Sequence, residues 1–267
     1  MELLPLVAGL FGAGLLAGFM AGLLGIGGGI VTIPALFIVF EAIDVPIEWR
    51  MHTAIATSLV IIIVTNISSI RAHHKRGGVD WDIVKDWWIV IVIGTVLGSF
   101  FAKTLKTEEL IYIFASFATL LAIKMFLPLD RLKLGKALPS GPFRFLPPAF
   151  IGFISAIMGI GGGSFSVPYM TLYGVQIHRA VGTASLVGLV ISVAGGFGYL
   201  IGGLGISGLP FGTIGFVNFP SAAAVGAGAV LMAPVGAMVA HKLPKNVLSV
   251  IFGLFLVLAT YRLVSSI

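Results

Sequence analysis

The chain has 267 residues, of which 58% are hydrophobic and only 10% are charged, whereas a soluble domain carries about 25% charged residues. Apolar runs of bilayer length recur along it without strand-like alternation, so the composition excludes both a soluble domain and a membrane β-barrel. The absence of cysteine excludes disulfides, thiolate metal sites and cysteine nucleophiles, and the net charge of +6 fits membrane orientation better than nucleic-acid binding. The sequence predicts an all-α polytopic membrane protein.

The first apolar stretch is predicted as a helix that ends near Leu24 and runs into the glycine-rich segment GIGGGIVTIP at residues 25–34. A short helix is expected over 30–41. Three long helices follow, at about 51–72, 83–102 and 108–126. The first half of the chain thus contains a glycine turn between two helices, followed by three helices of membrane-spanning length.

The second half is predicted to have the same order of elements. The segment GIGGGSFSVP at residues 159–168 lies between two short helices, expected at 145–158 and 164–173. Long helices are expected at 179–201, 215–240 and 245–264. The helix at 145–158 is only about 21 Å long, which is too short to span a bilayer. Each glycine segment is therefore interpreted as the tip of a hairpin of partial helices.

Two further blocks repeat besides the glycine segments. The sequence AIATSL at residues 54–59 resembles AVGTASL at 180–186, and residues 98–105 resemble residues 236–243. Three matched blocks in the same order indicate an internal duplication. We expect a first transmembrane repeat over residues 1–127, a cytoplasmic linker over 128–144 and a second transmembrane repeat over 145–267.

Charged loops predict that the two repeats face opposite sides of the membrane. Residues 71–85 contain four Lys or Arg residues, and the linker contains four more, whereas the corresponding loop of the second half, at 202–214, has no charge. Because Lys and Arg concentrate in cytoplasmic loops, we expect the first two segments inside and the third outside. This gives two inverted-topology repeats, each a broken-helix hairpin plus three long transmembrane helices, as in many secondary transporters.

The glycine turns are the candidate substrate site. Irregular backbone at membrane depth is tolerated where it lines a cavity or is buried in protein, and a helix that begins at such a turn directs its free N–H groups towards it. Two such N-termini would bind an anion without a buried Lys or Arg. The candidate substrate-binding residues are Gly27, Gly28, Gly29, Thr32, Thr57, Ser58, Gly161, Gly162, Gly163, Ser164, Ser166, Thr183 and Ser185. Asn66 and Asn218 are further candidate donors.

Simpler roles compete with this interpretation. Gly14, Gly18 and Gly22 follow a four-residue spacing that is typical of close helix packing, and membrane Ser and Thr side chains often bond their own helix backbone. No Asp or Glu falls at the centre of a predicted span, so the carboxylate relay of many proton-driven carriers is missing and energy coupling stays open. No metal site or cofactor is expected.

The doubled GxGGGxxxxP motif, with A-x-x-T-S or A-V-G-T-A-S after it, resembles the TauE/SafE family of sulfite exporters over essentially the whole chain. The resemblance implies transport of small sulfur-containing anions such as sulfite, sulfoacetate or related sulfonates, in a direction that differs between members. The glycine motifs match the family pattern, as do Thr57, Ser58, Thr183 and Ser185. The lack of cysteine departs from cysteine-dependent thiosulfate carriers.

The function expected is a secondary transporter that moves a small sulfur-containing anion across the bacterial cytoplasmic membrane by alternating access. An anion channel that uses the same helix-dipole site is the alternative. An enzyme is not expected, because no paired nucleophile and base and no HExxH motif is present. The partners expected are the anionic substrate and the lipid bilayer, with no nucleic acid, and either a monomer or a homodimer fits the sequence.

Overall fold

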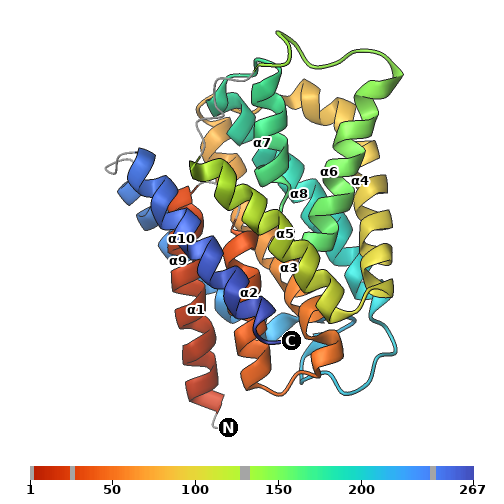
Figure 1. The fold of residues 1–267 in the computed structure, drawn as a ribbon, viewed down its shortest axis with the longest axis vertical. Helices are drawn as coiled ribbons and strands as arrows, with labels where there is room; N and C mark the ends of the chain where they lie inside the picture. The colour runs from red at the N-terminus through yellow and green to blue at the C-terminus, as the bar shows by residue number, and fades with distance from the viewer. Residues whose placement is uncertain (1–2, 25–27, 127–132, 241–244) are drawn as a thin grey trace.

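Helices account for most of the computed structural model, which describes residues 3–24, 28–126, 133–240 and 245–267 (Figure 1). The first five are α1 (Leu3–Leu24), α2 (Gly29–Ala42), α3 (Ile47–His74), α4 (Trp81–Thr104) and α5 (Thr107–Phe126). The next five are α6 (Leu146–Met158), α7 (Gly163–Leu172), α8 (Ile177–Gly202), α9 (Phe219–Ala240) and α10 (Lys245–Val264). A short 3₁₀ helix, Pro142–Phe145, precedes α6. The all-α prediction is confirmed for the described residues.

Within the described ranges, four helices are long and apolar enough to cross a membrane, namely α3, α4, α8 and the Phe219–Gly236 part of α9. Helix α3 has 28 residues, which corresponds to about 42 Å at 1.5 Å per residue and exceeds the hydrocarbon thickness. Helices α2, α6 and α7 have 14, 13 and 10 residues, so none of them reaches across a bilayer alone. The chain therefore combines spanning helices with two helix–turn–helix segments of partial length.

The predicted helix at 215–240 begins later than expected. Residues Thr213–Ile214 (β1) and Val217–Asn218 (β2) form an antiparallel hairpin around Gly215, which has a φ of 58°, and α9 starts at Phe219. The side chain of Asn218 accepts a hydrogen bond from the backbone N–H of Ser221 at 2.9 Å and donates to Thr213 Oγ1 at 2.8 Å. This side chain therefore joins the hairpin to the first turn of α9.

Small residues allow two pairs of helices to pack closely. On α1, a Cβ at Gly14, Gly18 or Gly22 would overlap the backbone of Val225, Ala229 or Ala233 on α9. On α4, a Cβ at Gly94 would lie 2.8 Å from the carbonyl carbon of Ala149 on α6. The packing role predicted for the glycines of α1 is confirmed, and α4 and α6 use the same device.

Loops that are distant in sequence meet at the two ends of the helix bundle (Figure 1). At one end, the carboxylate of Asp80 forms an ion pair with Arg179 at 2.6 Å, and Asp86 forms one with Arg144 at 2.9 Å. At the other end, Arg262 pairs with Glu41 at 3.4 Å. The loop before α4, the segment before α6 and the start of α8 thus share one end.

Candidate functional site

The same backbone conformation begins both short helices after the glycine segments. Gly28 precedes α2 with a φ of 69°, and Gly162 precedes α7 with a φ of 71°. L-residues rarely adopt such left-handed angles, so glycine is required at both positions. Neither helix has a side-chain cap at its N-terminus, and both first turns direct their free N–H groups into the turn.

The two turns are in direct contact in the interior. A Cβ on Gly29 would lie 2.8 Å from the carbonyl oxygen of Gly159 and 3.0 Å from the Cα of Ile160. The hydroxyl of Ser58, on α3, donates to the same Gly159 carbonyl at 3.2 Å. The sequence therefore located two segments that meet in space. Gly27 lies outside the described residues.

One isoleucine side chain of α3, Ile62, packs against both turns. Ile62 Cδ1 lies 2.9 Å from the position of a Cβ on Gly29, and its Cγ2 lies 2.8 Å from the corresponding position on Gly161. The backbone of Gly161 also packs closely against Gly188 on α8. Gly161 and Gly162 therefore belong to the closely packed centre where α3, α7 and α8 meet, and half-buried Gly163 begins α7 beside them.

Two of the predicted hydroxyls bond their own helix. Thr32 Oγ1 donates to the Gly28 carbonyl at 2.9 Å, and Ser166 Oγ donates to the Gly162 carbonyl at 2.8 Å. Each bond joins a residue to the carbonyl four positions earlier, and each secures the first turn of its helix. These two side chains hold the turn geometry and have no hydroxyl hydrogen left for a ligand while these bonds persist.

Three other predicted residues lie away from the turns. Thr57 Oγ1 accepts from the backbone N–H of Asn218 at 3.1 Å, and Thr183 Oγ1 accepts from the backbone N–H of Asp80 at 2.9 Å. Each threonine therefore anchors the residue that immediately precedes another helix: Thr57 holds the residue before α9, and Thr183 holds the residue before α4. Ser185 Oγ forms a hydrogen bond of 2.8 Å with Ser69 Oγ across α3 and α8.

Ser164 does lie at a turn, with its hydroxyl buried and without a hydrogen-bond partner among the described residues. Two residues that sequence reasoning missed, Ser155 on α6 and Ser192 on α8, are in the same state, as is the amide nitrogen of Asn66. Ser155 precedes the N-cap Gly162 by seven residues. The sequence shows this spacing, but only the folded turn brings the Ser155 side chain close to Gly162.

No Asp, Glu, Lys or Arg side chain is buried in the part of the chain that the structure describes. The buried polar side chains are hydroxyls, amides and the imidazole of His52, and the two helix N-termini add backbone N–H groups. Backbone N–H groups at a helix N-terminus carry a positive partial charge that favours anions. The arrangement can therefore hold a small anion by hydrogen bonding and helix dipoles.

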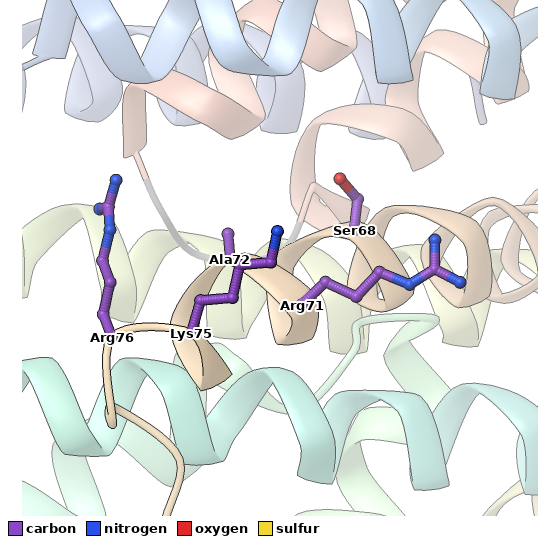
Figure 2. A pocket seen from close by; sticks show the side chains of 5 residues that line it. All are labelled: Ser68, Arg71, Ala72, Lys75 and Arg76. Atoms are coloured by element: carbon purple, nitrogen blue, oxygen red, sulfur yellow. The ribbon is translucent and has the colours of Figure 1, made fainter.

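Basic side chains line a pocket of about 400 Å³ at the C-terminal end of α3. Figure 2 shows its lining residues, Ser68, Arg71, Ala72, Lys75 and Arg76, along the last turns of the helix and the residues just after it. A second pocket, of about 440 Å³, lies where α3 begins and α4 ends, and has Glu48 and Glu108 beside Lys103 and Lys106. One end of the molecule thus presents a cationic pocket and the other a mixed one.

Comparison with known proteins agrees with the membrane architecture. Residues 10–263 match the family described as sulfite exporter TauE/SafE. A probable membrane transporter protein of Haemophilus influenzae is 33% identical over 250 residues, covering 94% of this chain and 95% of the relative. The probable membrane transporter protein YunE of Bacillus subtilis is 27% identical, with 94% of each chain covered. No solved structure matches the chain significantly.

The chain therefore belongs to the TauE/SafE family and is a multi-pass membrane transporter, not an enzyme.

Proposed function

We propose that this TauE/SafE family member is a secondary transporter for a small sulfur-containing anion, such as sulfite, sulfoacetate or a related organosulfonate, in the cytoplasmic membrane. The observation that carries the proposal is the contact between two glycine turns, each at a helix N-terminus, inside a chain of a transporter family. The positive ends of two helices favour an anion over a cation. The choice of sulfur rests on the family description.

Inverted repeats over residues 1–127 and 145–267 are part of the proposal, with residues 128–144 as a cytoplasmic linker. Three pairs of equivalent features support it: the φ angles of the two N-cap glycines, the bonds of Thr32 and Ser166 to them, and the anchoring roles of Thr57 and Thr183. The packing of α1 on α9 and of α4 on α6 supports it as well, because an inversion that exchanges the halves exchanges these pairs.

The cationic pocket supports the orientation in which the loop after α3 faces the cytoplasm. Arg71, Lys75 and Arg76 raise the local concentration of anions at that end, because a charged pocket attracts opposite charge over a Debye length of about 8 Å in physiological salt. In this proposal the pocket is the cytoplasmic vestibule, and the glycine turns are the substrate site beyond it.

Among the candidate residues that the structure describes, the candidates for substrate contact are the glycine turns, Gly28–Gly29 and Gly161–Gly163, and Ser164, whereas the Ser58 hydroxyl is engaged with the Gly159 carbonyl. Thr32 and Ser166 hold the first turns of α2 and α7, and Thr57, Thr183 and Ser185 hold the helices around them.

Counterflow in proteoliposomes tests the proposal. Vesicles that contain purified protein and unlabelled sulfite or sulfoacetate are diluted into labelled anion, with protein-free vesicles as the control. A carrier gives saturable uptake that unlabelled anion inside the vesicle accelerates, because the loaded site returns faster than the empty one. No uptake of any of these anions refutes the sulfur-anion proposal.

An anion channel with the same helix-dipole site remains the alternative, and the same assay separates the two. With the membrane potential clamped, flux through a continuous pore shows no acceleration by internal substrate and no saturation in the range where a carrier saturates. The pockets at opposite ends of the bundle, about 400 and 440 Å³ in volume, fit either mechanism.

A further inference from the structure

Unpaired polar groups gather around the second glycine turn, residues 159–163. The side chains of Ser155 and Ser164 are 0% and 3% exposed, and their hydroxyls have no hydrogen-bond partner in the described residues. Ser155 Oγ lies 3.5 Å from the position of a Cβ on Gly162. Asn66, 5% exposed, has its unpaired Nδ2 3.4 Å from the corresponding position on Gly161.

Ser192 adds a fourth group from α8. It lies four residues after Gly188, whose backbone packs against Gly161, so both residues lie on the face of α8 that meets the turn. Its hydroxyl is buried and unpaired in the described part of the chain. Side chains from α3, α6, α7 and α8 therefore approach one turn with free polar hydrogens.

Two of these groups, the hydroxyls of Ser155 and Ser164, have no counterpart at the first glycine turn, although its N-cap has the same conformation. The residue seven positions before Gly28 is Ala21, where the second turn has Ser155, and Ala21 Cβ lies 3.3 Å from the Cβ position on Gly28. The residue two positions after Gly28 is Ile30, where the second turn has Ser164. Folding of such a turn thus does not require the hydroxyls.

A buried donor without an acceptor is destabilising, so four of them around one turn indicate a partner that the polypeptide does not supply. Hydroxyl and amide hydrogens, together with the N–H groups that begin α7, offer donors from several directions and no fixed positive charge. Donors of this kind suit an anion with several oxygens on one centre, and the positive end of α7 disfavours a cation.

We propose that the second glycine turn alone binds the anion, with Asn66, Ser155, Ser164 and Ser192 donating to the three oxygens of an SO₃ headgroup. The first turn then serves as a packing element that rests on Gly159 and Ile160 through Gly29. This inference rests on the proposed function, and assigns its site to one of the two turns.

Alanine substitutions test the assignment, because they remove one oxygen each and leave the packing almost unchanged. The variants are Ser155→Ala, Ser164→Ala and the double variant. Ser99→Ala is the matched control, because Ser99 is also a buried serine but its hydroxyl is satisfied by the Val96 carbonyl at 2.8 Å. Each protein is examined for melting temperature without anion, for its shift with sulfite, sulfoacetate and methanesulfonate, and for the KM of proteoliposome uptake.

The double variant is expected to melt at or above the wild-type temperature without anion, because it loses unpaired polar groups. It is also expected to lose the anion-induced shift and to raise KM by about tenfold or more, since a hydrogen bond to a charged group is lost at each site. Ser99→Ala is expected to change neither the shift nor KM.

Two results overturn the inference in distinguishable ways. In the first result, the wild-type protein transports the anion, and the double variant has the same KM and the same anion-induced shift in melting temperature. This result refutes the assignment to the second turn and leaves the proposed function standing. Absence of transport and of any shift in the wild-type protein refutes the proposed function and this inference together.

Discussion

A methyl group added to α1 should change stability in opposite directions at two glycines only six residues apart. At Gly18 the added Cβ would overlap the carbonyl oxygen and Cα of Ala229 on α9. At Gly12 no atom beyond the helix's own backbone lies within 4 Å of the same position. The substitution Gly→Ala is identical in the two variants, so only the neighbouring helix distinguishes them.

The magnitudes follow from two opposing effects. Alanine is favoured over glycine inside a helix by about 1 kcal/mol, which both variants gain. Overpacking costs about 1–3 kcal/mol, and the upper end applies at Gly18 because backbone atoms of Ala229 cannot rotate away. Gly12→Ala should therefore gain about 1 kcal/mol, and Gly18→Ala should lose about 2 kcal/mol.

Thermal unfolding of the two purified variants in the same detergent measures this difference. For a chain of this size, 1 kcal/mol corresponds to a change in melting temperature of about 2–4 °C, so the variants should differ by roughly 6–12 °C. A Gly18→Ala protein that melts with or above Gly12→Ala would show that α1 and α9 are not in backbone contact. It would also remove the packing argument for the α4–α6 pair, which rests on the same geometry.

Two further predictions concern the ends of the bundle. Thr183→Val should lower the unfolding free energy by about 1–3 kcal/mol, because it leaves the Asp80 N–H without its acceptor. The control is Thr104→Val, which removes an exposed hydroxyl that bonds its own helix and should be nearly neutral in the same melting assay. Arg71→Gln combined with Lys75→Gln should raise the KM for anion uptake at low salt with little change in kcat. The difference in KM between this variant and the wild-type protein should shrink towards 1 M salt, because screening increases. A change in KM that is independent of salt would contradict a vestibule role for the pocket.

Helix positions followed closely from the sequence where local composition decides them. The helix predicted at 245–264 is observed over Lys245–Val264, and the glycine segments end α1 and α6 as expected. The hairpin before α9 was missed because Phe216 and Val217 are apolar and were interpreted as part of the hydrophobic run of the helix. It forms where the Thr57 side chain accepts the N–H of Asn218, a contact between residues 161 positions apart.

The candidate site shows a similar division. Each glycine turn is encoded by a few adjacent residues, and both turns were therefore identified from the sequence. Ser155 and Ser192 are serines flanked by apolar residues in helices, where such residues usually bond their own backbone. Only the packed structure shows that their hydroxyls remain unpaired beside the turn. Thr57 and Thr183 were predicted as substrate ligands from their repeated sequence context, and the repeat of that context also explains their shared role as anchors.

The packing of the helices constrains how an alternating-access mechanism would work in this chain. Each closely packed pair, α1 with α9 and α4 with α6, joins one helix from residues 1–127 to one from residues 145–267. The two sequence halves therefore cannot move as separate rigid bodies without breaking backbone contacts such as Gly18 on Ala229 and Gly94 on Ala149. A motion that preserves both pairs has to move α1 with α9 relative to α4 with α6. Gly29, at the start of α2, contacts Gly159 and Ile160 in the turn after α6. Such a motion would therefore change the distance between the two glycine turns directly.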